Sequence, residues 1–142
     1  EILEEYFMIA NQHVHVLDEF NNFMEEEIYQ MMIATTEDQD ELILENTTTL
    51  KVARWWDKAC DIIPCNGGKD IGIQKILNYF NFNKEEAMAF GDGGNDISML
   101  KYVGAGVAMG NAKDDVKAIA DYITDSVQED GIVSALKHFE II

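Results

Sequence analysis

Residues 87–96 read AMAFGDGGND, an uninterrupted apolar run followed at once by a glycine-rich turn that carries two carboxylates. An apolar run of this length predicts a strand that is buried on both faces, as in a parallel sheet covered by helices. In open sheets of that kind, ligands bind beyond the carboxyl ends of the strands. We therefore expect the turn at 91–96 to lie where a ligand or an ion would bind.

The sequence around this turn alternates between helical and strand patterns. Upstream, residues 70–80 place Ile73, Ile76, Leu77 and Phe80 on one face of a predicted helix. Downstream we predict helices and strands in alternation, at 96–103, 107–109, 114–120, 122–124 and 132–139. Such alternation predicts an α/β fold with a parallel, Rossmann-like sheet.

Residues 1–65 have a different organisation. They predict a small α+β unit with an antiparallel sheet, and the change of pattern falls at 64–68, beside the only proline. Thr36 and Gln39 have the form of a capping box at the start of a short helix. The predicted elements are a helix at 1–10, a strand at 28–34, a helix at 36–44 and a hairpin of 51–55 with 59–63.

The formal charge of -17 excludes some classes of partner. Residues 1–65 carry 15 acidic residues against three basic ones, and residues 66–142 carry 12 against seven. A surface this acidic repels nucleic acid and anionic membranes, so we expect neither as a partner. No apolar run approaches the ~20 residues of a membrane-spanning helix, and the 142 residues contain no basic-then-apolar segment of the signal type.

Two cysteines, Cys60 and Cys65, have no histidine at ligand spacing. Buried thiols explain them better than a disulfide or a metal site does, which points to a reducing cytoplasm.

Asp92 and Asp96, with Asn95 between them, offer the oxygen ligands that a hard cation such as Mg²⁺ prefers. The alternative is a tight turn in which Asn95 or Asp96 caps the following helix. Lys69 follows a glycine turn 23 residues before Asp92. Alone it would be an ordinary surface lysine, but beside a metal-binding carboxylate it supplies a compact positive charge for a phosphate.

Residues 66–139 resemble the C-terminal half of a haloacid dehalogenase (HAD) superfamily hydrolase, of the Cof-like sugar-phosphate phosphatase branch. Residues 1–65 resemble, less sharply, the later part of the α+β cap domain that this branch inserts before the lysine. The motifs that carry the resemblance are Gly68-Lys69, AFGDGGNDISML at 89–100, GVAMGNA at 106–112, ADYIT at 120–124 and EDG at 129–131.

The resemblance implies a Mg²⁺-dependent phosphatase that acts on a small phosphorylated metabolite through an aspartyl-phosphate intermediate. It implies that Lys69 is a catalytic residue that holds both the phosphate and the nucleophilic aspartate. Asp92 would bind the metal, Asp96 would support the metal and its waters or the lysine, and Asn95 would bind near the phosphate.

One part of the family pattern is missing. The family carries its nucleophile and its general acid/base in an Asp-x-Asp-Gly-Thr motif, and the only Asp-x-Asp here is Asp38-Gln39-Asp40, which lacks Gly-Thr and lies in a predicted helix. We therefore expect the protein to continue upstream of Glu1 and the 142-residue chain alone to be inactive. Its open sheet edge would also allow it to self-associate. The alternative is a non-catalytic binding or assembly module with the same half-core.

The sequence leaves the roles of four further residues open. Arg54, Trp55 and Trp56 could face a substrate from the cap or pack in its core, and adjacent tryptophans on a strand should point to opposite faces. Asn111 follows another core strand, so it could lie near the site or cap a helix.

Overall fold

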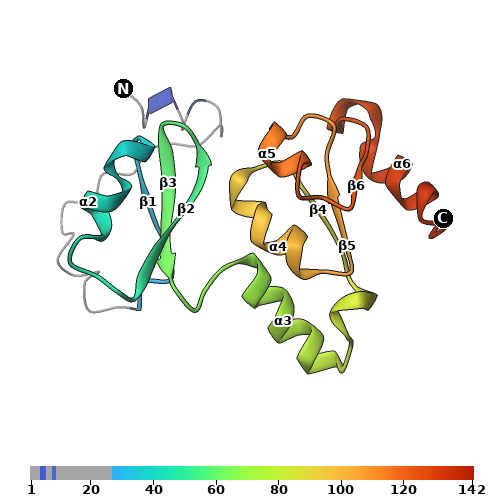
Figure 1. Ribbon diagram of the computed structural model, residues 1–142, viewed down its shortest axis with the longest axis horizontal. Helices are drawn as coiled ribbons and strands as arrows, with labels where there is room; N and C mark the ends of the chain where they lie inside the picture. Colours follow the sequence, from blue (N-terminus) through green and yellow to red (C-terminus); the bar gives the residue numbers. More distant parts are fainter. Residues whose placement is uncertain (1–3, 6–7, 9–26) are drawn as a thin grey trace. The chain divides into compact units, whose positions relative to one another are not determined.

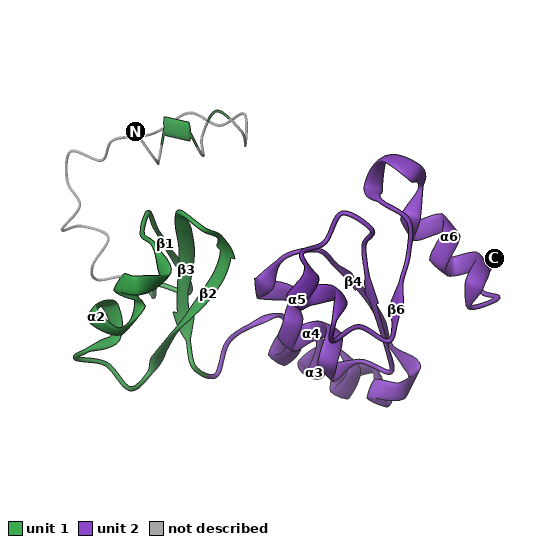
Figure 2. Ribbon diagram, turned by 45° about the horizontal axis from the view of Figure 1, so that its top comes forward, with its two compact units in different colours: residues 1–65 green, residues 66–142 purple. Residues whose placement is uncertain are grey.

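A computed structural model describes residues 4–5, 8 and 27–142. The chain divides into two compact units, residues 1–65 and residues 66–142 (Figure 2). The helix predicted at 1–10 lies largely outside the described residues.

In its described residues, unit 1 contains an antiparallel sheet and a short helix. Its strands β1 (Met31–Ile33), β2 (Leu50–Trp56) and β3 (Ala59–Pro64) lie in the order β1-β3-β2, and α2 (Asp40–Leu44) follows the 3-10 turn η2 (Glu37–Gln39) (Figure 1). The predicted strand, helix and hairpin are confirmed. The predicted capping box is wrong, because Thr36 makes no side-chain cap and Gln39 instead accepts a hydrogen bond from the Thr35 hydroxyl at 2.6 Å.

Arg54 is an internal residue of unit 1. Its Nη1 donates to the carbonyl oxygens of Thr35 at 2.9 Å and of Trp56 at 3.3 Å, and its Nη2 pairs with Asp40. Burial acts to lower the pKa of Arg54, but the hydrogen bond and charge of Asp40 outweigh this and raise it. The guanidinium is thus engaged inside unit 1, and Asp40, half of the only Asp-x-Asp sequence, is engaged with it.

The two tryptophans do not point to opposite faces of the sheet. The pairing of β2 with β3 shifts between Arg54 and Trp56, which leaves Trp55 as an extra residue in the strand. Such a bulge interrupts the alternation of side chains. The rings of Trp55 and Trp56 therefore stack, with centroids 6.2 Å apart and planes inclined by 20°.

The cysteines of unit 1 differ from each other. Cys60 is buried, and its burial raises the pKa of the thiol, whereas Cys65 is exposed. Both are free thiols, so the buried-thiol interpretation is confirmed for Cys60 alone.

Unit 2 contains a parallel three-stranded sheet in the order β4-β5-β6. The strands are paired so that their last residues lie side by side. Gly91, the last residue of β4, lies opposite Ala108, which lies opposite Ile123. The strands are β4 (Met88–Gly91), β5 (Ala105–Ala108) and β6 (Tyr122–Ile123). The helices are α3 (Lys69–Phe80), α4 (Ile97–Tyr102), α5 (Asp114–Lys117) and α6 (Gly131–His138), with 3-10 turns η3 (Lys84–Glu86), η4 (Gly94–Asp96) and η5 (Val127–Glu129). The predicted α/β alternation is confirmed (Figure 1).

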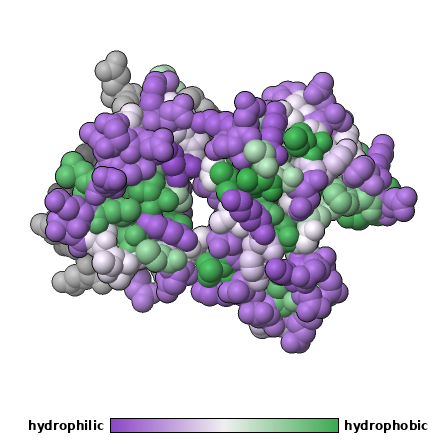
Figure 3. Space-filling view, viewed as in Figure 1, coloured by the Kyte–Doolittle hydropathy of each residue, from purple (hydrophilic) through white to green (hydrophobic). Residues whose placement is uncertain are grey.

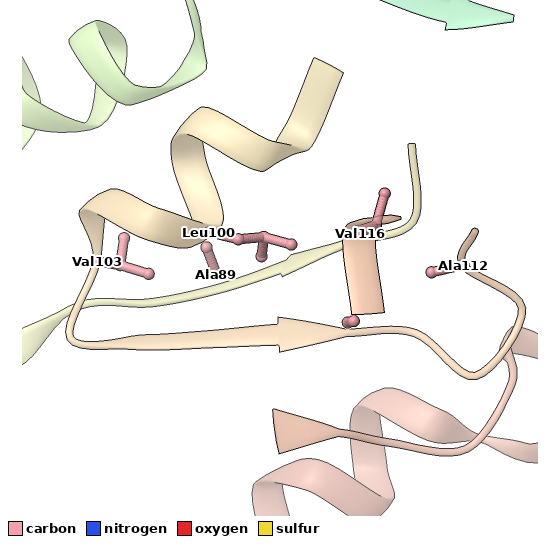
Figure 4. Close-up of a cluster of buried hydrophobic side chains, with 6 residues drawn as sticks. Ala89, Leu100, Val103, Ala112 and Val116 are labelled. Carbon is pink, nitrogen blue, oxygen red and sulfur yellow. The ribbon is translucent and has the colours of Figure 1, made fainter. Parts of the chain in front are cut away.

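The core of unit 2 lies between the sheet and α3–α5. Leu100 of α4 and Val103, the residue that follows the helix, pack over Ala89 of β4, and Val116 of α5 belongs to the same cluster (Figure 4). Gly106 lets α4 approach β5, because a Cβ there would lie 2.3 Å from the carbonyl oxygen of Leu100.

The apolar stripe of α3 is only partly used by this core. Ile73 packs against the cluster, whereas Ile76 and Phe80 are 61% and 60% exposed. Apolar atoms accordingly reach the surface among hydrophilic ones (Figure 3). In the sheet of the described residues, β4 is an edge strand. None of the described helices has the length and apolar character needed to cross a membrane.

Candidate active site

The loop that follows β4 places an exposed carboxylate at the carboxyl end of the sheet. Asp92 is exposed and comes directly after Gly91, the buried last residue of the strand. A Cβ at Gly91 would lie 2.6 Å from the Cβ of Asp96. Glycine at this position therefore lets the side chain of Asp96 fold back under the end of the strand.

Asp96 is buried and its carboxylate connects the loop to α3. Oδ2 accepts the backbone N–H groups of Asp92 at 3.0 Å and Gly93 at 3.1 Å, and Oδ1 accepts a hydrogen bond from the Lys69 ammonium. Asp96 makes no side-chain cap to α4. The bond from the Gly93 N–H is, however, a capping contact, because Gly93 is the N-cap residue of the 3-10 turn η4 (Gly94–Asp96). Asp96 therefore caps this turn and not α4. Asn95 lies on η4 in the same loop and is half-buried.

Lys69 is the first residue of α3. It follows Gly68, whose φ of 130° is a conformation that residues with a Cβ rarely adopt. The Lys69 side chain is 49% exposed although its partner Asp96 is only 7% exposed. An ammonium has three donors, so one N–H used on Asp96 leaves two for an anion or for water.

A second contact fixes the start of α3 against α4. The hydroxyl of Ser98 donates to Oδ1 of Asp70, the residue after Lys69, at 3.1 Å. The sequence analysis missed this contact, because an exposed serine and an aspartate 28 residues apart carry no local signal.

Asn111 lies beside Asp92. Its Nδ2 donates to Oδ2 of Asp92 at 2.9 Å, and its Oδ1 accepts the backbone N–H of Val127 at 3.1 Å. Of the two roles left open for Asn111, proximity to the site is the one that the structure supports. The structure thus brings four residues together at the carboxyl end of one sheet: Lys69, Asp92, Asp96 and Asn111.

The donor set fits a partial Mg²⁺ site. The described residues contain no group of three or more His, Cys, Asp or Glu side chains that could hold a metal. Mg²⁺, however, usually keeps several waters and binds through one or two carboxylates together with substrate phosphates. Asp92 fits as such a carboxylate ligand, since it is exposed and Asn111 holds only one of its oxygens. Asp96 fits a supporting role, because both of its oxygens already accept hydrogen bonds.

The sequence matches a known protein family over most of its length. The family model for haloacid dehalogenase-like hydrolases matches residues 3–136. The chain belongs to the haloacid dehalogenase-like hydrolase family. One similar protein is YkrA of Bacillus subtilis (strain 168), which is 39% identical to this chain over 116 residues. The match covers 82% of this chain and 45% of YkrA.

Solved structures of HAD enzymes share the fold. A sugar phosphatase of HAD subclass IIB superposes with a TM-score of 0.88 at 40% identity, covering 98% of this chain and 54% of that one. A HAD phosphatase from Bacteroides thetaiotaomicron gives 0.87 at 35% identity, covering 99% and 53%. The chain therefore spans about half the length of these HAD relatives.

Another relative carries the name of a substrate in its own name. The 5-amino-6-(5-phospho-D-ribitylamino)uracil phosphatase YcsE of Bacillus subtilis (strain 168) is 49% identical over 71 residues, which cover 50% of this chain and 28% of that protein.

Proposed function

We propose that the protein to which this HAD chain belongs is a Mg²⁺-dependent phosphatase that hydrolyses small phosphate esters, with sugar phosphates as the favoured class. The observation that carries the proposal is that the half-exposed Lys69 pairs with the buried Asp96. The Asp96 carboxylate in turn accepts the backbone N–H of the exposed Asp92. The relatives support the substrate class, since they include a sugar phosphatase and a kanosamine-6-phosphate phosphatase.

In this proposal the residues of the site have different tasks. Asp92 binds Mg²⁺, Asp96 holds Lys69 and the loop backbone, and Asn95 binds near the phosphate. Lys69 holds the phosphate and the nucleophile through its remaining N–H donors. Mg²⁺, when bound, neutralises charge on the phosphoryl oxygens.

We also propose that the nucleophilic aspartate comes from a segment upstream of residue 1. A parallel strand added to the open edge of β4 would end beside Gly91, so a carboxylate just beyond it would face Asp92 and Lys69. Its oxygen would bond to phosphorus as the ester oxygen leaves, and water would then release phosphate from the aspartate. Residues 1–65 would then be part of the cap and residues 66–142 half of the catalytic core.

The remaining expectations follow from this division. The 142-residue chain alone should be inactive, and its open β4 edge should favour self-association. The substrate is a small phosphorylated metabolite, with no nucleic acid or membrane as partner, in keeping with the net charge of -17. The free thiols fit a cytoplasmic location.

The test is phosphate release by the whole protein from p-nitrophenyl phosphate and a panel of phosphorylated sugars, with and without Mg²⁺. We expect Asp92→Ala to lower the rate at least about 100-fold, because it removes a fixed ligand of the ion that stabilises the transferring group. Asp114→Ala, which removes an exposed carboxylate on α5, is the matched control and should leave the rate unchanged.

Two outcomes would contradict the proposal. Unchanged turnover by Asp92→Ala would remove the assigned metal ligand. A whole protein that releases no phosphate from any ester of the panel would favour the binding or assembly module instead.

A further inference from the structure

Asn111 bridges two of the three loops that leave the carboxyl edge of the sheet. Its amide contacts the Asp92 carboxylate in the loop after β4 and the backbone of Val127 in the loop after β6. We propose that Asn111 is a positioning residue that holds the Asp92 carboxylate in the orientation that binds a divalent cation. The inference rests on the proposed function, and it assigns a task to a residue outside the 91–96 loop.

The chemistry of the two neighbours determines which residue type fits at position 111. An ionised carboxylate only accepts hydrogen bonds, and a backbone N–H only donates them. An amide has one group of each kind, so Asn111 satisfies both neighbours in one orientation and neither in the flipped one. An aspartate at the same place would set two carboxylates against each other, which is unfavourable.

The sheet register explains how Asn111 reaches both neighbours. Gly91, Ala108 and Ile123 are level across the sheet, so the loops that follow them start side by side. Asn111 lies in the middle loop, three residues after the end of β5.

Asp92 is thereby held at two points. Asp96 accepts its backbone N–H at 3.0 Å, and Asn111 donates to its carboxylate at 2.9 Å. The first contact places the residue, and the second fixes the rotation of the carboxylate. With Oδ2 engaged by Asn111, the orientation of Oδ1 toward an incoming cation is fixed as well. Partners that orient a metal ligand in this way typically change metal affinity by about 10–100-fold when they are removed.

The test is calorimetric titration of Mg²⁺ into the whole protein. We expect Asn111→Ala to raise the Kd for Mg²⁺ about 10-fold, since the Asp92 carboxylate then rotates freely. Asn78→Ala removes an exposed amide on α3 and is the matched control, with an unchanged Kd.

A second variant removes only the outer half of the bridge. Val127 is the first residue of η5 and follows Ser126, whose ψ is 166°. Proline suits the first position of a helical turn after an extended residue. Val127→Pro should therefore fold, lose the N–H that orients Asn111, and raise the Kd for Mg²⁺ by less than Asn111→Ala does.

Hydrolysis of p-nitrophenyl phosphate separates positioning from a merely structural role. For Asn111→Ala the Mg²⁺ concentration at half-maximal rate should rise with the Kd, while the rate at saturating Mg²⁺ is retained. A structural role would instead lower the rate at every Mg²⁺ concentration.

The outcomes distinguish this inference from the function on which it rests. Mg²⁺ binding by Asn111→Ala equal to that of the parent overturns the inference alone. If that variant does not fold, unchanged binding by Val127→Pro overturns it. A parent protein that neither binds Mg²⁺ nor hydrolyses any ester overturns both.

Discussion

Each of the two units holds an ion pair between a basic residue and an aspartate, and the two pairs are built differently. In unit 1 both partners are largely covered, with Arg54 18% and Asp40 24% exposed. In unit 2 the acid is buried and the base is half-exposed, with Asp96 7% and Lys69 49% exposed. Arg54 also donates to several backbone carbonyl oxygens, whereas the ammonium of Lys69 is bonded to Asp96.

The difference shows how an ion pair that stabilises a fold can be told from one that is suited to chemistry. A cation whose donors are all directed inward contributes to stability and has nothing to offer a ligand. A cation held on one side by a buried acid keeps donors for a ligand on the other. By this criterion the Lys69–Asp96 pair is suited to binding a phosphate, and the Arg54–Asp40 pair stabilises unit 1.

Substitution of Lys69 should have the largest effect on activity. We expect Lys69→Met to lower phosphate release by the whole protein about 100- to 1000-fold, because it removes a cation from the transferring group. Stability should also fall, by about 1–3 kcal/mol, because the buried Asp96 carboxylate then keeps only its two backbone N–H donors. Lys75→Met, on the exposed side of the same helix, is the control. A loss of activity that only follows a loss of folded protein would contradict the assigned role.

The opposite result is expected at Arg54. Arg54→Met leaves Asp40 and the carbonyl oxygens without their donor, and should cost about 3 kcal/mol of unfolding free energy. Both tryptophans of the chain lie in unit 1, so denaturant unfolding followed by tryptophan fluorescence reports on this unit. Lys58→Met, which breaks the exposed pair with Glu5, should cost less than about 1 kcal/mol. Equal losses in the two variants would remove the distinction between covered and open pairs.

The smallest effect concerns the glycine that makes room for Asp96. Gly91→Ala should destabilise unit 2 by about 2 kcal/mol, because the new Cβ meets the Asp96 side chain. Gly72→Ala lies in α3 with nothing within 4 Å, and should stabilise by about 0.5–1 kcal/mol. Thermal unfolding followed by circular dichroism measures both. A stabilising Gly91→Ala would show that Asp96 does not need its place under the strand.

The sequence predicted the features that depend on neighbouring residues. The strand, the glycine turn and the helix around Asp92 are confirmed, since an apolar run and two glycines are local signals. The strand order could not be predicted, because it depends on contacts between segments that are far apart in the sequence. The exposure of Ile76 on α3 could not be predicted either, because periodicity places it on the apolar face of the helix but does not show what covers that face.

The contacts that the sequence missed depend on register. The extra residue at Trp55 prevents the two tryptophans from pointing to opposite faces, and no local sequence pattern predicts it. The bond between Asn111 and Asp92 likewise depends on two strands ending level, which is a property of the sheet. The roles of Lys69, Asn95, Asp92 and Asp96 in catalysis stay predictions.

The level ends of β4, β5 and β6 also limit how such a chain can change in length. An inserted residue within a strand moves everything after it by about 3.3 Å and turns it to the other face of the sheet. An insertion in β4 or β5 would therefore carry Asp92 or Asn111 away from its partner. Insertions after Val127, or in the turns at the amino ends of the strands, leave Asp92, Asn111 and Val127 in place. The site therefore tolerates insertions in loops beyond these residues, but not insertions within the strands or between a strand end and the residue that follows it in the site.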